Sequence, residues 1–146
     1  EGLRKIYERA EGFICNKEEY QRILKKPDEH DVKNLMAAMR GYGPKITVLT
    51  DGPKGAYASD GTVSYFMPAY PDPKPPYERT GAGDAFSSTF VVALALGMDM
   101  EDALRWAPIN SMSVVQYVGA REGLLTREKL EEYLKNAPTD YEPKKI

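Results

Sequence analysis

The sequence predicts an α/β fold in which a mainly parallel central sheet lies between layers of helices. Three observations lead to this prediction. Residues 12–15 and 46–49 are short apolar runs typical of buried strands. Segments with helical spacing of apolar residues alternate with these runs. At 146 residues, the chain is long enough for one domain with a real core.

The first part of the chain is predicted to alternate helix and strand. Residues 2–10 should form a short helix, and the strand at residues 12–15 follows it. A second helix should run to Pro27, and a third from Val32 to the glycine and proline residues at 41–44, because these residues end helices. The second core strand, residues 46–49, comes next.

A hairpin and a proline-rich loop are predicted in the middle of the chain. Residues 56–59 and 63–67 are strand-like and are joined through Asp60-Gly61, a strong hairpin signal. Residues 68–77 contain five prolines, which predicts an extended surface loop. A long helix should follow and end at Gly97.

Two more helices and a tail complete the prediction. Asp99 should cap a helix whose apolar pattern extends to Val118, and Pro108 inside that pattern should kink or split it. Thr126 should cap the last helix. We expect residues 137–146 to be a tail.

Composition excludes several classes of function. The net charge of −2 gives no general attraction to nucleic acid or to anionic membranes. The longest apolar run is far shorter than a bilayer requires. Cys15 and His30 are the single cysteine and histidine, so neither a disulfide framework nor a conventional zinc site can form within the chain. Cys15 is interpreted as a buried hydrophobe, and a single cysteine suits the cytoplasm.

The most informative segment is Thr80-Gly81-Ala82-Gly83-Asp84, at a turn from loop to helix. Free N–H groups and the helix dipole make such a turn an anion site, and glycine allows close approach of a ligand. A carboxylate beside a bound phosphate suggests a base for an attacking hydroxyl. The alternative is that Asp84 only caps the helix.

Two further motifs follow predicted strands. Asn16-Lys17-Glu18-Glu19 comes after the first strand, and Thr50-Asp51-Gly52-Pro53-Lys54-Gly55 comes after the second. Each has a structural alternative, since Asn16 could cap a helix with Glu19 as an ordinary first-turn acid, and the glycines could be plain turn residues.

Together with Gly119-Ala120, these three motifs resemble the ribokinase-like (phosphofructokinase-B) carbohydrate kinases, over the C-terminal, nucleotide-binding half of that family's fold. The resemblance implies ATP-dependent phosphorylation of a sugar or sugar-like alcohol, with ATP and the sugar as partners. It implies that Asp84 is the general base and that Gly81, Ala82 and Gly83 form an anion hole. It implies that Asn16 and Glu19 orient Mg²⁺ through water. It assigns the ATP contacts to Thr50, Gly52, Gly55, Asn110 and Gly119.

The sequence also departs from the family pattern. Glu78-Arg79 stand where the family usually has Asp-Thr, near the site of the monovalent cation that activates some members, so K⁺ is a further candidate cofactor. The family's N-terminal, sugar-binding half has no counterpart here. We therefore expect a fragment that is inactive by itself, whose exposed sheet edge could support a homodimer.

Two other classes of nucleotide-binding protein fit the sequence poorly. A Rossmann dinucleotide site lacks its third glycine, and no Gly-Lys-Ser/Thr of a Walker ATPase is present. The serious alternative is an inactive nucleotide-binding or structural half-kinase.

Overall fold

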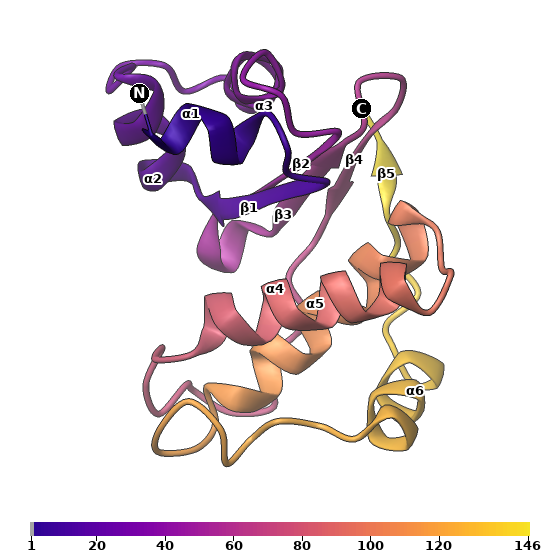
Figure 1. Ribbon diagram of the computed structural model, residues 1–146. Helices are drawn as coiled ribbons and strands as arrows, with labels where there is room; N and C mark the ends of the chain where they lie inside the picture. Colours follow the sequence, from indigo (N-terminus) through magenta and orange to yellow (C-terminus); the bar gives the residue numbers. More distant parts are fainter. Residues whose placement is uncertain (1) are drawn as a thin grey trace.

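The computed structural model describes residues 2–146, which form three layers (Figure 1). Helices α2 and α3 cover one face of a sheet, and α4 and α5 cover the other. The strands are β1 (Gly12–Asn16), β2 (Ile46–Thr50), β3 (Ala56–Ser59), β4 (Ser64–Met67) and β5 (Lys144–Lys145). The helices are α1 (Gly2–Tyr7), α2 (Lys17–Leu24), α3 (Val32–Arg40), α4 (Ala82–Ala95), α5 (Met100–Val114) and α6 (Arg127–Lys135).

The sheet has strand order β1-β2-β3-β4-β5 within the described residues and is mixed. Only β1 and β2 pair in parallel, with Asn16 opposite Thr50, and the other three pairs are antiparallel. The α/β fold is confirmed, but the expectation of a mainly parallel sheet is wrong for these strand pairs. The reason is the short connections after β2 and β3, because a link of a few residues can only reverse the chain.

Residues of β2 alternate between two cores. Val48 packs toward α4 and α5, whereas Leu49 packs toward α2 and α3. Tyr20 of α2 is fully buried in the second core, and its hydroxyl donates to the carbonyl of Val48 at 3.2 Å. This packing fixes the carboxyl ends of β1 and β2 beneath α2, on the same side of the molecule as the start of α4 (left in Figure 1).

Helix α5 differs from the prediction at two points. Pro108 does not split it, since α5 runs from Met100 to Val114 without a break. The helix also stops before Val118, which is exposed. It stops because the carbonyl of Val115 accepts the amides of Tyr77 and Glu78, at 2.8 and 3.4 Å, from the proline-rich loop.

The C-terminal segment is packed rather than a loose tail. Tyr141 is only 3% exposed, and its hydroxyl donates to the carbonyl of Arg105 at 2.7 Å. Lys144 and Lys145 then pair with β4 as β5. The aromatic ring of Tyr141 explains the difference, because its burial holds a polar segment onto α5. Thr126 caps α6 as predicted.

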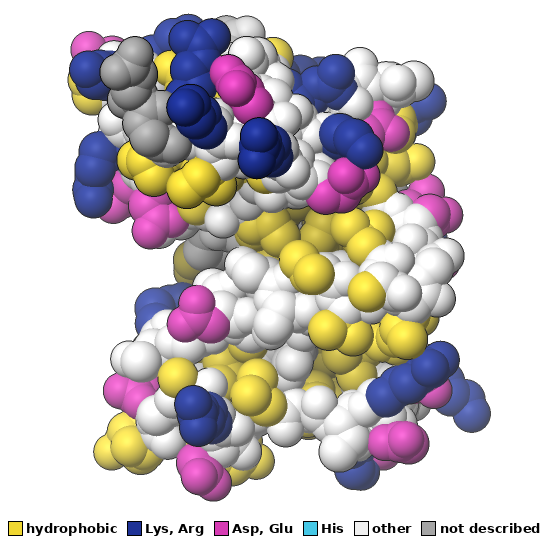
Figure 2. Space-filling view, in the orientation of Figure 1, with side chains coloured by type: hydrophobic (Ala, Val, Ile, Leu, Met, Phe, Trp, Pro, Cys, Tyr) yellow, Lys and Arg dark blue, Asp and Glu magenta, His cyan; other side chains and the backbone are white. Residues whose placement is uncertain are grey.

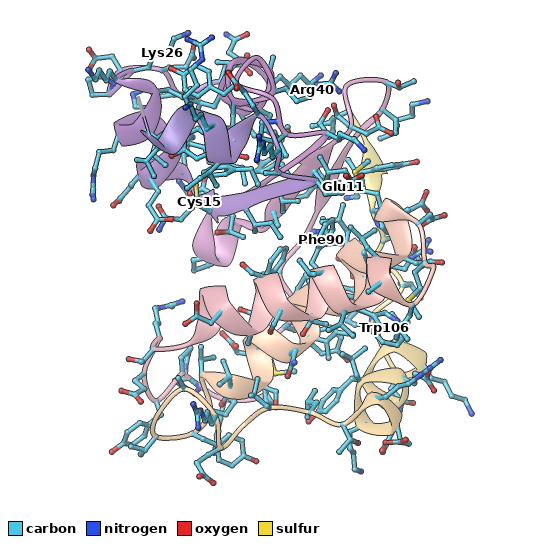
Figure 3. All side chains as sticks on the ribbon, viewed as in Figure 1. Glu11, Cys15, Lys26, Arg40, Phe90 and Trp106 are labelled. Atoms are coloured by element: carbon cyan, nitrogen blue, oxygen red, sulfur yellow. The ribbon has the colours of Figure 1, made fainter. Side chains whose placement is uncertain are left out.

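One face of the molecule carries exposed apolar groups. Figure 2 shows hydrophobic side chains gathered between the sheet and α4, and Figure 3 shows Phe90 extending from α4 toward the sheet. Val91, Val92 and Leu96 of α4 are each more than half exposed. Of these, Val91 lines a hollow with Gly12 and Ile14 of β1, which is an edge strand among the described residues.

Candidate functional site

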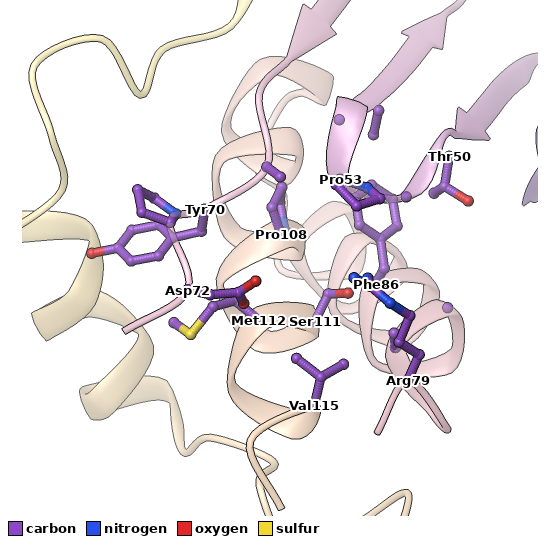
Figure 4. A pocket seen from close by; sticks show the side chains of 17 residues that line it. Thr50, Pro53, Tyr70, Asp72, Arg79, Phe86, Pro108, Ser111, Met112 and Val115 are labelled. Carbon is purple, nitrogen blue, oxygen red and sulfur yellow. The ribbon is translucent and has the colours of Figure 1, made fainter. Parts of the chain in front are cut away.

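A pocket of about 340 Å³ lies where the carboxyl end of β2, the start of α4 and one face of α5 meet (Figure 4). The proline-rich loop closes the end opposite the start of α4. The pocket is lined by Thr50, Gly52, Pro53, Gly55, Ala56, Ala69, Tyr70, Pro71, Asp72, Arg79, Ala82, Gly83, Phe86, Pro108, Ser111, Met112 and Val115.

The loop after β2 forms one wall and contains three of the predicted nucleotide contacts. Thr50, Gly52 and Gly55 all line the pocket. Gly55 has a φ of 106° and lies against the backbone of Met67, so the fold itself requires glycine there. Gly52 also has a positive φ, of 54°, but a Cβ at this position would meet nothing within 4 Å. Its wall of the pocket is therefore open to a ligand.

The start of α4 forms the facing wall. Gly81 occupies the N-cap position with a φ of 82°, and no side chain caps the helix. A Cβ at Gly81 would lie 2.7 Å from the Cβ of Ala120, so the fold requires this glycine as well. The amide of Ala82 already donates to the carbonyl of Arg79 at 3.3 Å. Of the three predicted anion-hole residues, Ala82 thus has an engaged amide, whereas the first-turn amides of Gly83 and Asp84 have no acceptor within the helix.

Gly83 has no structural reason to be glycine. It lies inside the helix with ordinary helical φ, and a Cβ there would meet no protein atom within 4 Å. Glycine in a helix costs roughly 0.5–1 kcal/mol relative to alanine. A residue that costs stability and borders a pocket is typical of a site where a ligand approaches the backbone closely.

Asp84 is the third residue of α4 and is exposed. The alternative that Asp84 is the helix N-cap is wrong, because Gly81 holds that position. Its backbone carbonyl accepts the Ser88 hydroxyl at 2.7 Å, within the helix. Asp84 does not line the pocket itself, but it follows Gly83, which does.

Helix α5 contributes one face to the pocket, but not the predicted ATP contact Asn110. One face of α5 lines the pocket through Pro108, Ser111, Met112 and Val115. Asn110 does not line it, since its amide nitrogen donates to the Thr89 hydroxyl at 2.8 Å and its oxygen accepts the Leu125 amide at 2.9 Å. Asn110 is therefore a buried structural link between α4, α5 and the segment before α6. The spacing 108, 111, 112, 115 is one helical face, so this face was detectable in the sequence.

Gly119 also lies outside the pocket lining and has a structural contact of its own. Its φ is 86°, and its amide donates to a carboxylate oxygen of Glu78. With Gly81 packed on Ala120, this bond joins the 119–120 turn to the start of α4.

Asn16 and Glu19 form a capping box at the start of α2. The Glu19 amide donates to Asn16 Oδ1, and the Asn16 amide donates to Glu19 Oε2, both at 2.9 Å. Asn16 pairs with Thr50, so this helix start is adjacent to the pocket wall. Within residues 2–146, no cluster of three or more metal-binding side chains occurs. The structure thus has the helix-capping arrangement at this position.

Cys15, immediately before this helix start, is half-buried (Figure 3). Burial first, and the nearby Glu19 carboxylate second, raise the pKa of its thiol to about 12. The thiol is therefore protonated at neutral pH, as suits a packing residue rather than a nucleophile.

Tyr70, Asp72 and Arg79, in or next to the proline-rich loop, also line the pocket and were not assigned from the sequence. The Tyr70 ring packs edge-on against Tyr133 and Tyr141, and its hydroxyl donates to the carbonyl of Tyr133 at 3.0 Å. Asp72 accepts the Gln116 side-chain amide at 3.4 Å. A proline-rich loop has no periodicity that would reveal which side chains turn inward. Arg79 was visible only as a departure from the family pattern.

Within residues 2–146, no helix is long and apolar enough to cross a membrane.

The chain is similar in sequence to several small-molecule kinases. It is 38% identical to ribokinase of Bacillus subtilis (strain 168) over 115 residues, which are 74% of this chain and 38% of the relative. It is 35% identical to cytidine kinase of Thermococcus kodakarensis over 104 residues, which are 70% of this chain and 36% of the relative. The chain thus spans well under half the length of these relatives.

Solved structures share the fold. Ribokinase of Arabidopsis thaliana, complexed with ribose and ATP, superposes with a TM-score of 0.83 at 23% identity, over 90% of this chain and 43% of that one. Ribokinase of Thermotoga maritima gives a TM-score of 0.81 at 24% identity, over 91% of this chain and 45% of that one. The model of the pfkB family of carbohydrate kinases matches residues 1–127. The chain therefore belongs to the pfkB family of carbohydrate kinases.

Proposed function

We propose that the chain is the nucleotide-binding part of a kinase that transfers a phosphoryl group from ATP to a hydroxyl of a sugar or sugar-like alcohol. The observation that carries the proposal is the start of α4, where Gly83 lies open beside the pocket and no side chain caps the helix. Membership of a carbohydrate kinase family supports the reaction class.

The chemistry we propose relies on positioning and charge. Phosphoryl transfer needs little covalent help from a protein, so binding and stabilisation of the transferred phosphate dominate. The amides of Gly83 and Asp84 hold the terminal phosphate and the charge that gathers on it. The Asp84 carboxylate accepts the proton of the attacking hydroxyl. Thr50, Gly52 and Gly55 line the rest of the phosphate path, and the apolar face of α5 receives the base.

Mg²⁺ is proposed at the start of α2. Asn16 Oδ1 accepts one hydrogen bond in the capping box and keeps a second lone pair, and Glu19 keeps its other carboxylate oxygen. One carboxylate with waters and substrate phosphates is a usual Mg²⁺ environment, so these residues fit the ion. When bound, Mg²⁺ neutralises charge on the phosphates. K⁺ is proposed only as a further cation near Glu78 and the 119–120 turn.

The alternative is an inactive nucleotide-binding or structural half-kinase. This alternative fits the pocket as well as an active kinase does. The two hypotheses differ because only the active kinase requires the Asp84 carboxylate. The chain covers well under half of its relatives, so sugar binding is proposed to need polypeptide beyond these residues.

Two measurements test the proposal. Calorimetric titration of the chain with ATP and Mg²⁺ should give saturable binding. The natural protein that contains this chain should then consume ATP with at least one member of a sugar panel, while residues 1–146 alone should show background rates. Absence of ATP binding would refute the site, whereas binding without turnover of any sugar by the natural protein would favour the inactive half-kinase.

Self-association and a cytoplasmic location are also proposed. The β1 edge and the exposed Val91 beside it form a surface on which copies could pair. Light scattering should show a mass that rises with concentration, and a constant monomer mass at high concentration would contradict pairing.

A further inference from the structure

We propose that Arg79 is a phosphate-binding residue of the pocket, whose guanidinium group binds the phosphates of the nucleotide. This inference rests on the proposed ATP site and adds to it a charged side chain. No motif assigned a role to this position, where the sequence departs from the family pattern.

Charge within the pocket is distributed unevenly. Among the lining residues, Arg79 is the single cation and Asp72 the single anion. Figure 4 shows them at separate places, with Arg79 beside Phe86 at the start of α4 and Asp72 beside Tyr70 and Met112. A nucleoside triphosphate is most strongly stabilised when its phosphates lie at the end of the pocket that contains Arg79. That end also contains the uncapped helix start and Gly83.

The guanidinium is available for a ligand. Arg79 is exposed and makes no ion pair and no side-chain hydrogen bond to another described residue. By contrast, Lys17 beside the loop after β2 is already paired, since its Nζ lies 3.9 Å from Asp51 Oδ2. The neighbouring acid, Glu78, is also engaged, since it accepts the amide of Gly119. Arg79 therefore keeps its full charge for an anion in the pocket.

The backbone holds Arg79 in place from both sides. The amides of Tyr77 and Glu78 donate to the carbonyl of Val115 at the end of α5, and the carbonyl of Arg79 accepts the amide of Ala82. The Glu78 side chain is bonded to the 119–120 turn. The Arg79 side chain points elsewhere, toward Phe86 and Pro53 (Figure 4). The backbone therefore loses little conformational entropy when an anion binds.

Arginine suits this task better than lysine would. Its planar guanidinium presents paired donors that match two phosphate oxygens, and it keeps its charge at every physiological pH. The amides of Gly83 and Asp84 are fixed donors on one side of the phosphate site, and Arg79 would close it from the side of the loop.

The test compares ligands with and without phosphates. In the natural protein that contains this chain, calorimetry should give Kd values for ATP and for adenosine in the wild type, Arg79→Met, Arg79→Lys and the matched control Arg9→Met. Arg9 is exposed and remote from the pocket lining. We expect Arg79→Met to raise the Kd for ATP about tenfold or more, as loss of a charged hydrogen bond predicts. The Kd for adenosine should change less than about twofold, and Arg9→Met should change neither.

Several results would decide the matter. Arg79→Lys should recover part of the ATP affinity, and the salt dependence of ATP binding should be weaker in Arg79→Met than in the wild type. A change of less than about twofold for ATP, or an equal loss for adenosine, would overturn the role of Arg79 and leave the ATP site standing. Failure of the wild type to bind ATP would overturn the proposed function itself.

Discussion

The starts of α2 and α4 are two helix N-termini on the same side of the molecule, and they treat their free backbone amides in opposite ways. At α2, Asn16 and Glu19 cap each other's amides in a closed capping box. At α4, Gly81 holds the N-cap position and no side chain caps the helix. Uncapped amides cost stability unless water or a ligand satisfies them.

The difference separates a capped helix start from one that we propose to bind a ligand. An N-cap side chain contributes about 1 kcal/mol, so leaving it out at α4 is a loss that the fold accepts beside its pocket. Gly83 adds to that loss without any packing need. The stability given up at α4 and kept at α2 supports the proposal that α4, rather than α2, binds the phosphate.

The largest expected effect is at Asp84. In the natural protein that contains this chain, Asp84→Asn should lower kcat by roughly 10²–10⁴-fold, because a neutral amide cannot accept the hydroxyl proton. Since Asp84 is not the N-cap, its removal should cost only the 0.3–1 kcal/mol typical of a first-turn charge. The ATP Kd should stay the same or fall, because a negative charge near the phosphates is removed. Steady-state rates, melting temperature and calorimetry on the same samples check this; near-native kcat would remove Asp84 from the chemistry.

Gly83 and Gly81 give the next largest effect, as a matched pair. Gly83→Ala should keep the free energy of unfolding or raise it by up to about 1 kcal/mol. The new Cβ meets no atom outside its own helix, and alanine favours helix. The substitution should nevertheless weaken ATP binding about tenfold, since that Cβ enters the space of the phosphate.

Gly81→Ala should behave in the reverse way. Its positive φ and the contact with Ala120 predict a loss of stability of about 1–3 kcal/mol. Urea unfolding beside ATP titration separates the two variants. If both lost stability alike, or if Gly83→Ala bound ATP normally, the distinction drawn between the two glycines would be wrong.

The sequence predicted both helix starts but could not rank them. Helix caps at Asp99 and Thr126, the hairpin at Asp60-Gly61 and the glycine motif are local signals, and the structure confirms the caps and the hairpin. Whether Asn16 caps or binds depends on where the Glu19 side chain turns, and both options share one sequence pattern. Local signals fix where elements begin, not which donors remain free.

Tertiary contacts account for the errors. The direction of β3 relative to β2 follows from a short connection, and the end of α5 follows from Val115 accepting amides of a distant loop. Asn110 was assigned to ATP only through the family resemblance, whereas its side chain makes internal hydrogen bonds, as buried polar groups usually do. Arg79 escaped assignment because no periodicity describes a proline-rich loop.

The smallest expected effect is at the closed helix start, and it tests whether α2 has any role beyond capping. Asn16→Ala should lower the free energy of unfolding by about 1 kcal/mol, because the Glu19 amide loses its acceptor. Glu19→Gln should unfold like the wild type, since glutamine also completes a capping box.

If Glu19 helps to hold Mg²⁺, Glu19→Gln in the natural protein should raise the Mg²⁺ concentration for half-maximal rate. Glu18→Gln, at the neighbouring exposed acid, is the matched control. An unchanged Mg²⁺ dependence in Glu19→Gln would leave α2 with its capping box alone, and the start of α4 would then be the one helix terminus of the pair that serves the reaction.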